Sequence, residues 1–214
     1  MAKILLDSAN IKDAESAAEL GFVKGITTNP TLMKKETSDP IKHTSILLQT
    51  GSWEEFYYQP TGIYGSLQKE LESVLELDKK RIILKLPATP DGLILAKKMS
   101  DIGAKIALTA AQSPHIIAVA ESAGYVAVIP YYDRAMRDIR TESTLIQSMV
   151  KIRCGKTSII AASVKNIGQV FHTLYQGADA VTISLKTIKE LLEHPGSIEA
   201  EQAFLEEYRS IKYV

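Results

Sequence analysis

Apolar residues along the chain gather in eight short runs, separated by stretches in which they recur every three to four positions. The runs are continuous rather than alternating, which is typical of strands buried on both faces of a parallel sheet. They lie about 25 residues apart, which leaves room for one helix after each strand. The predicted strands are residues 3–6, 23–28, 53–58, 82–86, 105–109, 125–130, 157–162 and 180–185.

The intervening stretches predict helices. Asn10 precedes the first of them as a cap, and Pro30 suits the first position of a short one. Other helices are predicted to end at Leu48 and Val150, and residues 133–142, rich in charge, are expected to form a loop. The remaining predicted helices are residues 11–20, 66–79, 91–102, 114–123, 167–176 and 186–194.

Eight strand–helix units in 214 residues predict an α/β protein with a (β/α)8 TIM barrel. An open doubly wound sheet is the alternative, but no glycine-rich phosphate loop follows the first strand. A break is expected at 195–196, followed by an amphipathic helix at 199–213. We therefore predict a barrel over residues 1–196 and a C-terminal helix within 197–214, which caps the barrel or contacts another subunit.

Charge and composition exclude several partners. Lys plus Arg and Asp plus Glu both number 25, so the balance favours neither nucleic acid nor an anionic membrane. No apolar stretch approaches the roughly 20 residues that span a bilayer, and the start shows no signal-peptide pattern. The single cysteine, Cys154, fits a reducing compartment. These features predict a cytoplasmic protein without nucleic-acid or membrane partners.

The fourth strand carries one lysine, Lys85, inside an apolar run. Desolvation lowers the pKa of a lysine and leaves a fraction of free amine, which attacks carbonyl carbons to form a Schiff base. The alternative is a lysine at a strand end that reaches solvent.

Polar residues follow the other strands at their carboxyl ends, the face on which barrel enzymes build their sites. Singly, each has an ordinary structural role as a cap, a turn residue or a backbone partner. Their convergence around a buried lysine favours an active site. The four histidines lack metal-ligand spacing, so no metal site is predicted. The rim residues are Asp7, Thr27, Asn29, Gln59, Thr109, Tyr131, Arg134, Ser163 and Lys165.

Five motifs in this order resemble the small transaldolases and fructose-6-phosphate aldolases. They are LLDSAN, GITTNPTLMKK, RIILKLPATPDG, IPYYDR and IIAASVK, spread over the whole predicted barrel. The resemblance implies a class I enzyme on a (β/α)8 barrel, with its Schiff-base lysine on the fourth strand and no metal or organic cofactor. It also implies a homo-oligomer, with a decamer of two pentamers as the arrangement often found in the aldolase branch.

By position, the resemblance assigns the Schiff base to Lys85 and assistance in proton transfer to Asp7. Asn29 would hold the dihydroxyacetone hydroxyls. Gln59 and Thr109 would orient a catalytic water.

The resemblance also implies a sugar phosphate as substrate. Thr27 belongs with the substrate-binding residues on this basis. The positions that would take the phosphate are Arg134, Ser163 and Lys165.

Two positions separate the branches of the family. Typical transaldolases carry glutamate on the third strand and phenylalanine on the sixth, whereas this chain has Gln59 and Tyr131, as in the aldolase branch. Tyr131 is then a candidate general acid/base. The expected reaction is cleavage of fructose 6-phosphate to dihydroxyacetone and glyceraldehyde 3-phosphate. The alternatives are dihydroxyacetone transfer from a ketose phosphate or similar anionic ketose, and a catalytically silent barrel that binds sugar phosphates.

Overall fold

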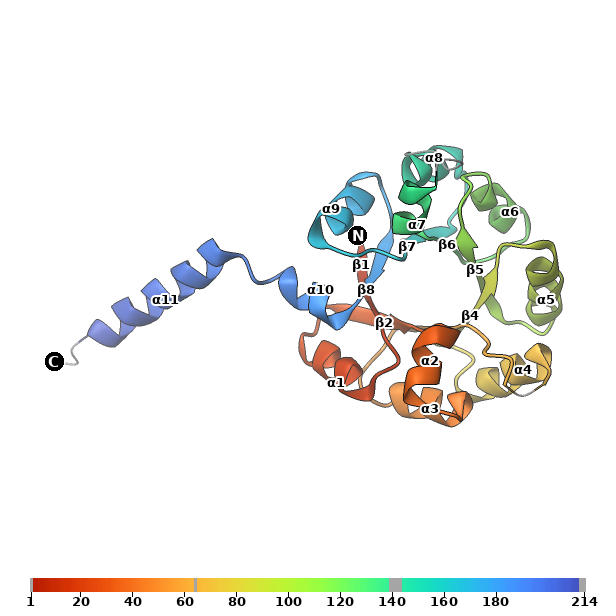
Figure 1. Cartoon of the computed structure of the whole chain (residues 1–214), viewed down its shortest axis with the longest axis horizontal. Coiled ribbons are helices and arrows are strands. Elements are labelled where there is room, and N and C mark those ends of the chain that lie inside the picture. Colours follow the sequence, from red (N-terminus) through yellow and green to blue (C-terminus); the bar gives the residue numbers. More distant parts are fainter. Residues whose placement is uncertain (1, 64, 139–143, 212–214) are drawn as a thin grey trace.

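The computed structural model describes residues 2–63, 65–138 and 144–211. Eight parallel strands close into a barrel in sequence order, β1 pairing with β8, and helices surround it (Figure 1). This confirms the predicted (β/α)8 barrel. The strands are β1 (Lys3–Asp7), β2 (Val23–Thr27), β3 (Glu55–Tyr58), β4 (Ile82–Pro87), β5 (Lys105–Ala111), β6 (Ala127–Pro130), β7 (Ser158–Ala161) and β8 (Ala180–Ile183).

Helices follow every strand of the barrel. Within the described residues, no helix is both long enough and apolar enough to cross a membrane. The helices are α1 (Ile11–Glu19), α2 (Pro30–Glu36), α3 (Pro40–Leu47), α4 (Leu67–Leu77), α5 (Pro90–Asp101), α6 (Ile116–Ser122), α7 (Tyr132–Arg137), α8 (Leu145–Ile152), α9 (Ile167–Tyr175), α10 (Leu185–Glu190) and α11 (Pro195–Ser210).

Two local predictions were wrong. The segment expected to be a loop at 133–142 begins as helix α7, while 139–142 lie outside the described residues. The expected break at 195–196 is instead the first turn of α11, because proline has no N–H to lose there and its fixed φ suits that position. The C-terminal helix therefore starts two residues before the expected C-terminal segment, which was placed at 197–214.

Short polar side chains set where most of the helices begin. Each accepts a hydrogen bond from a backbone N–H three residues further on, which satisfies a donor that the helix itself leaves free. The confirmed cap at Asn10 bonds the N–H of Asp13, and Pro30 follows the cap of α2 as predicted. The caps with this bond are Asn10, Asn29, Asp39, Ser66, Thr89, Asn166 and Ser184.

The barrel interior changes from apolar to polar along the strands. Because side chains alternate between the two sides of a strand, residues two apart share the inward face. Inward residues near the middle of the barrel form a buried apolar cluster, and the next inward residue toward the carboxyl end is polar. These pairs are Leu5 and Asp7, Tyr57 and Gln59, Ile83 and Lys85, Ala107 and Thr109, Ile129 and Tyr131, and Ala180 and Thr182.

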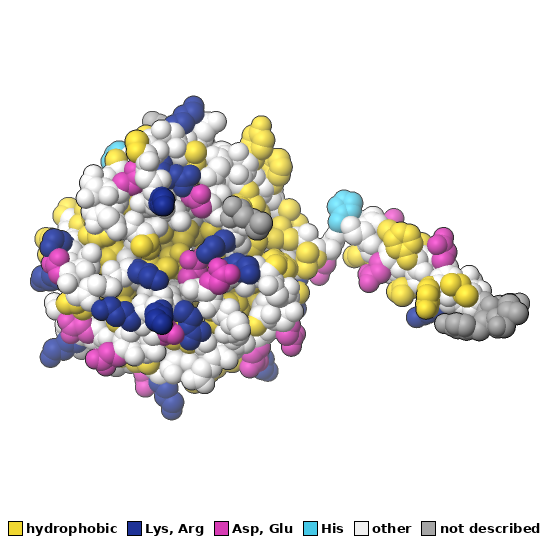
Figure 2. Space-filling view, turned by 180° about the vertical axis from the view of Figure 1, so that it is seen from behind, with side chains coloured by type: hydrophobic (Ala, Val, Ile, Leu, Met, Phe, Trp, Pro, Cys, Tyr) yellow, Lys and Arg dark blue, Asp and Glu magenta, His cyan; other side chains and the backbone are white. Residues whose placement is uncertain are grey.

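The opposite end of the barrel is closed by charged groups of both signs, which gather on the face shown in Figure 2. The hydroxyl of Tyr57 donates to Glu55 there at 3.1 Å. Partly exposed pairs of this kind each contribute little to stability, but they neutralise one another. The paired residues are Lys3 with Glu54 and Glu55, Lys24 with Glu54, and Arg153 with Asp179.

Helix α11 projects from the barrel, and all its residues are exposed (Figure 1). Hydrophobic side chains lie along it (Figure 2), with Phe204 and Tyr208 each 67% exposed. An exposed apolar stripe of this kind is typical of an interaction surface. We therefore expect α11 to pack on another copy of this chain, as the resemblance implies.

Deleting residues 197–214 tests this expectation. The truncated protein should retain its barrel, because no described residue of α11 is buried. Its molar mass, measured by light scattering, should correspond to fewer subunits than that of the full chain. A truncated protein with the same number of subunits as the full chain would contradict the expected role of α11.

Candidate active site

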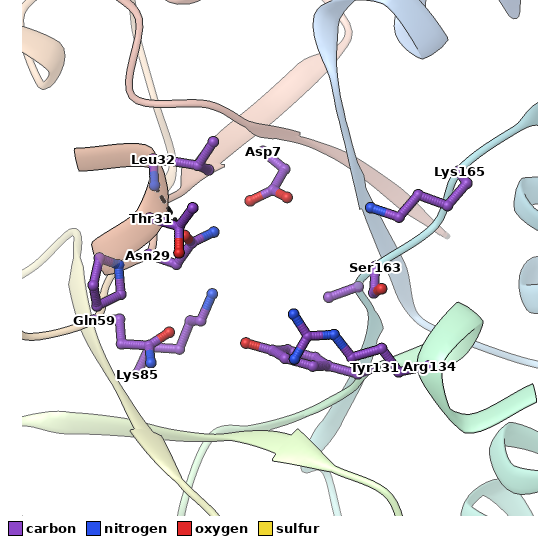
Figure 3. A pocket seen from close by; sticks show the side chains of 12 residues that line it. Asp7, Asn29, Thr31, Leu32, Gln59, Lys85, Tyr131, Arg134, Ser163 and Lys165 are labelled. Atoms are coloured by element: carbon purple, nitrogen blue, oxygen red, sulfur yellow. Dashed lines mark hydrogen bonds between the residues drawn. The ribbon is translucent and has the colours of Figure 1, made fainter. Parts of the chain in front are cut away.

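A cavity of about 430 Å³ opens at the carboxyl ends of the strands (Figure 3). This volume suits a small polar metabolite. It brings together eight of the predicted residues, while Thr27 and Thr109 are fully buried and do not line it. The lining residues are Asp7, Asn29, Pro30, Thr31, Leu32, Gln59, Lys85, Tyr131, Arg134, Ala162, Ser163 and Lys165.

Lys85 lies on the inward face of β4 and is only 2% exposed. Its amino group donates to the carbonyl oxygen of Thr28 at 3.0 Å. Burial lowers the pKa of Lys85, and the negative charge of Asp7 opposes that shift. The alternative of a solvent-directed lysine was therefore wrong, and the amine is placed to attack a carbonyl carbon.

Asp7 ends β1 beside a chain of hydroxyls. Thr27 donates to its carboxylate at 2.9 Å, and the Thr27 hydroxyl is 2.7 Å from that of Thr182. Because Thr27 gives its hydrogen to Asp7, Thr182 is the donor in the second bond. Burial raises the pKa of Asp7, against the opposing effects of Lys85 and Thr27. A buried carboxyl group with a raised pKa beside an amine is suited to proton transfer.

The side-chain oxygen and the side-chain nitrogen of Asn29 have different roles. Its side-chain oxygen caps α2 by accepting from the N–H of Leu32 at 3.0 Å. This bond fixes the side chain, and Figure 3 shows its nitrogen directed toward the centre of the cavity. A fixed donor at this point is suited to a hydroxyl or carbonyl oxygen of a substrate.

Tyr131 faces Lys85 across the cavity, with its hydroxyl pointing toward the amino group (Figure 3). The guanidinium carbon of Arg134 lies 5.0 Å from the centre of the Tyr131 ring. A cation at this distance from an aromatic face is attracted to it, so Arg134 helps to hold the ring in place. The phenol is therefore positioned to exchange a proton with a group bound at Lys85.

Gln59, directly after β3, and Thr109, on β5, flank the lysine strand. The side-chain oxygen of each is buried and has no hydrogen-bond partner among the described residues. Ala110, directly after Thr109, has a φ of 57° where the register of β5 and β6 shifts. Buried polar atoms are rarely left unpaired, so these two oxygens are available to a water or substrate hydroxyl.

Two residues near the site escaped the sequence analysis. Thr182 supports Asp7 through Thr27, and its place two residues after Ala180 was the only signal available. Glu70 on α4 is 1% exposed and accepts from the Tyr58 hydroxyl at 2.6 Å and the Gly62 N–H at 2.9 Å. It thereby fastens the loop that starts at Gln59, a contact that no local pattern predicts.

One side of the cavity carries positive charge. Lys165 points into the cavity from the loop after β7, and Arg134 on α7 lines the same side, with Ser163 between them (Figure 3). Neither residue forms an ion pair with any part of the chain that the structure describes. Ser163, with a φ of 58°, lines the same side. Two cations and a hydroxyl in this arrangement suit an anionic group such as phosphate.

No group of three or more His, Cys, Asp or Glu side chains is placed to hold a metal ion in the described ranges. The site instead offers an amine, a carboxyl, a phenol, an amide and two cations. These are the groups of covalent carbonyl chemistry combined with proton transfer.

Comparison with known proteins places these residues in context. A family described as Transaldolase/Fructose-6-phosphate aldolase matches residues 65–213. A "Probable transaldolase" of Desulfatibacillum aliphaticivorans is 32% identical over 223 residues, covering 98% of this chain and 99% of that protein. Proteins with the same name from Thermodesulfovibrio yellowstonii and Symbiobacterium thermophilum are 30% and 31% identical, each covering 98% of this chain, and 99% and 98% of their own lengths are matched.

The coupling between Lys85 and Asp7 gives a measurable pH effect. The pKa of Lys85, followed by NMR of labelled lysine, should lie below 10.5 in the native protein and fall further in Asp7→Asn. The carboxylate favours the ammonium form, so its removal leaves burial unopposed. Asp179→Asn, at the other end of the barrel, serves as the control. A rise or no change in the Lys85 pKa on Asp7→Asn would show that the two groups do not interact.

Proposed function

The chain belongs to the transaldolase/fructose-6-phosphate aldolase family and is an enzyme of that type, and from this premise we propose that it cleaves and forms fructose 6-phosphate through a Schiff base on Lys85. The observation that carries this proposal is the buried amine of Lys85, with its lowered pKa, in a cavity that also holds Asp7 and Tyr131. A structural lysine would gain nothing from such a position.

The first step is attack of neutral Lys85 on the ketone carbon of the sugar. Loss of water from the adduct gives an iminium ion, in which the positive nitrogen accepts electrons from the neighbouring carbon–carbon bond. Asn29 holds the hydroxyls of the dihydroxyacetone portion through its free amide nitrogen. The reaction as written needs no metal or organic cofactor, because the iminium is itself the electron sink.

Cleavage then separates the third and fourth carbons. Asp7 or Tyr131, acting through water, takes the proton of the fourth-carbon hydroxyl. The electron pair of the breaking bond moves to the iminium, so glyceraldehyde 3-phosphate leaves and an enamine of dihydroxyacetone stays on Lys85. Arg134, Ser163 and Lys165 hold the phosphate of the departing aldehyde by charge-assisted hydrogen bonds.

The fate of the enamine decides the class of enzyme. Protonation at carbon and attack of water on the resulting iminium release dihydroxyacetone, which makes the enzyme an aldolase. Gln59 and Thr109 support this route, since their buried oxygens, which have no hydrogen-bond partner among the described residues, flank Lys85 and suit a water molecule. Tyr131 is the acid/base group that we assign to it.

Transfer of the dihydroxyacetone unit is the second candidate. Here the enamine waits for another aldehyde instead of water, and the donor is a ketose phosphate or a similar anionic ketose. The names of the relatives favour this reading, because those compared above are called probable transaldolases. Both candidates share the Schiff base and differ only in the step that resolves it.

Free dihydroxyacetone separates the two candidates. An aldolase should form fructose 6-phosphate from dihydroxyacetone and glyceraldehyde 3-phosphate without a ketose donor. Tyr131→Phe should slow this reaction by roughly 10²–10⁴-fold, the usual contribution of a positioned acid/base group, and leave Schiff-base formation intact. Efficient transfer from fructose 6-phosphate to erythrose 4-phosphate, with no use of free dihydroxyacetone, would instead identify a transaldolase.

A further inference from the structure

The two cations of the candidate phosphate site come from different loops, and one side chain joins those loops. Arg134 lies on α7, after β6, whereas Lys165 lies between β7 and α9. Gln169, in the first turn of α9, accepts from the backbone N–H of Lys165 at 2.8 Å and donates to the Asp133 carboxylate at 3.0 Å. Both ends of one amide are therefore used, the oxygen on the backbone of Lys165 itself and the nitrogen on Asp133, the residue before Arg134.

Asp133 is held at this junction by further contacts. Its backbone N–H donates to the carbonyl oxygen of Ser163 at 3.3 Å, and its carboxylate pairs with Arg137. Its side chain is 13% exposed, and Gln169, with help from Arg137, holds the pKa of Asp133 below its usual range. Asp133 stays charged and does not line the cavity; Gln169 and Arg137 bind its carboxylate, and the ammonium of Lys165 also acts on it electrostatically.

Arg137 and Arg134 consequently have different tasks. Arg137 neutralises Asp133 on the outer side of α7, whereas Arg134 faces the cavity and has no acidic partner among the described residues. Gln169 is half-buried, so a change there does not open the core. The two hydrogen bonds of the Gln169 amide join the loops that carry the two cations, and they do not lie in the apolar core of the barrel.

We propose that Gln169, acting with Asp133, is a positioning residue that sets the preference of the site for phosphorylated aldehydes by fixing Arg134 and Lys165 in relation to each other. This rests on the proposed function, in which those cations hold the phosphate. One phosphate group contacts both cations at once, through two of its oxygens. Movement of the two loops relative to each other therefore weakens phosphate binding. The chemistry at Lys85 is unaffected by this movement.

The experiment compares Gln169→Ala, Gln169→Glu and Asp133→Ala with the wild type. The first readout is calorimetric titration of inorganic phosphate, which needs no turnover and so stays informative if the proposed reaction is wrong. The second is KM for glyceraldehyde 3-phosphate and for glyceraldehyde, with dihydroxyacetone as donor. Arg134→Ala is the positive reference. Gln68→Ala is the matched control, because Gln68 also lies on a helix and donates to an acidic side chain, Glu72.

Gln169→Ala should raise the phosphate Kd and the KM for glyceraldehyde 3-phosphate by about tenfold, and change the KM for glyceraldehyde by less than about twofold. Gln169→Glu should have a larger effect, since it places a second carboxylate against Asp133. Asp133→Ala breaks the same junction from the other side, so it should reproduce Gln169→Ala even if that variant folds poorly. The double variant Gln169→Ala/Asp133→Ala should bind phosphate no more weakly than either single variant.

Three outcomes would overturn the proposal. Equal changes for the two aldehydes would make Gln169 a general structural residue. Normal phosphate affinity in both Gln169→Ala and Asp133→Ala, with a loss confined to Arg134→Ala, would leave the anion site in place but remove Gln169 from its positioning. If Arg134→Ala also binds phosphate normally, the anion site itself is wrong and the proposal fails with it.

Discussion

The amine of Lys85, buried in the barrel interior and facing the charge of Asp7, is the constraint on which the site depends. Burial disfavours the ammonium form, while Asp7 favours it, so the balance between them sets how much free amine is present. The surrounding structure serves this balance. The apolar layer that includes Ile83 lies on the inward side below Lys85, Thr28 accepts its hydrogen bond, and Thr27 steadies Asp7.

The two ends of the barrel treat charge in opposite ways. At the amino-terminal end of the strands, acidic and basic side chains pair with each other. At the carboxyl-terminal end, Arg134 and Lys165 line the cavity and form no ion pair with the described residues, while the carboxylate of Asp133 is paired with Arg137. The bottom of the barrel is therefore neutralised, whereas one side of its top carries positive charge, which fits the anionic substrate that we propose.

The sequence predicted what local patterns control. Continuous apolar runs located the strands, caps such as Asn10 located helix starts, and polar residues at strand ends located most of the cavity lining. The prediction failed where contacts between distant segments decide. Helix α7 forms in a charged stretch because Tyr132 and Ala135 are buried against the barrel. Glu70 holds the loop that starts at Gln59, and Gln169 reaches Asp133, 36 residues away; no local pattern predicts either contact. The apolar stripe of α11 is not covered by the described residues.

Borohydride trapping followed by peptide mass spectrometry is the most direct test of the central claim. Incubation with fructose 6-phosphate and reduction should add the reduced dihydroxyacetone unit or the whole sugar to Lys85 alone among the lysines, and Lys85→Met should abolish both the adduct and turnover with the fold intact. Trapping at another lysine, or turnover that persists in Lys85→Met, would contradict the assignment of the Schiff base to the buried amine.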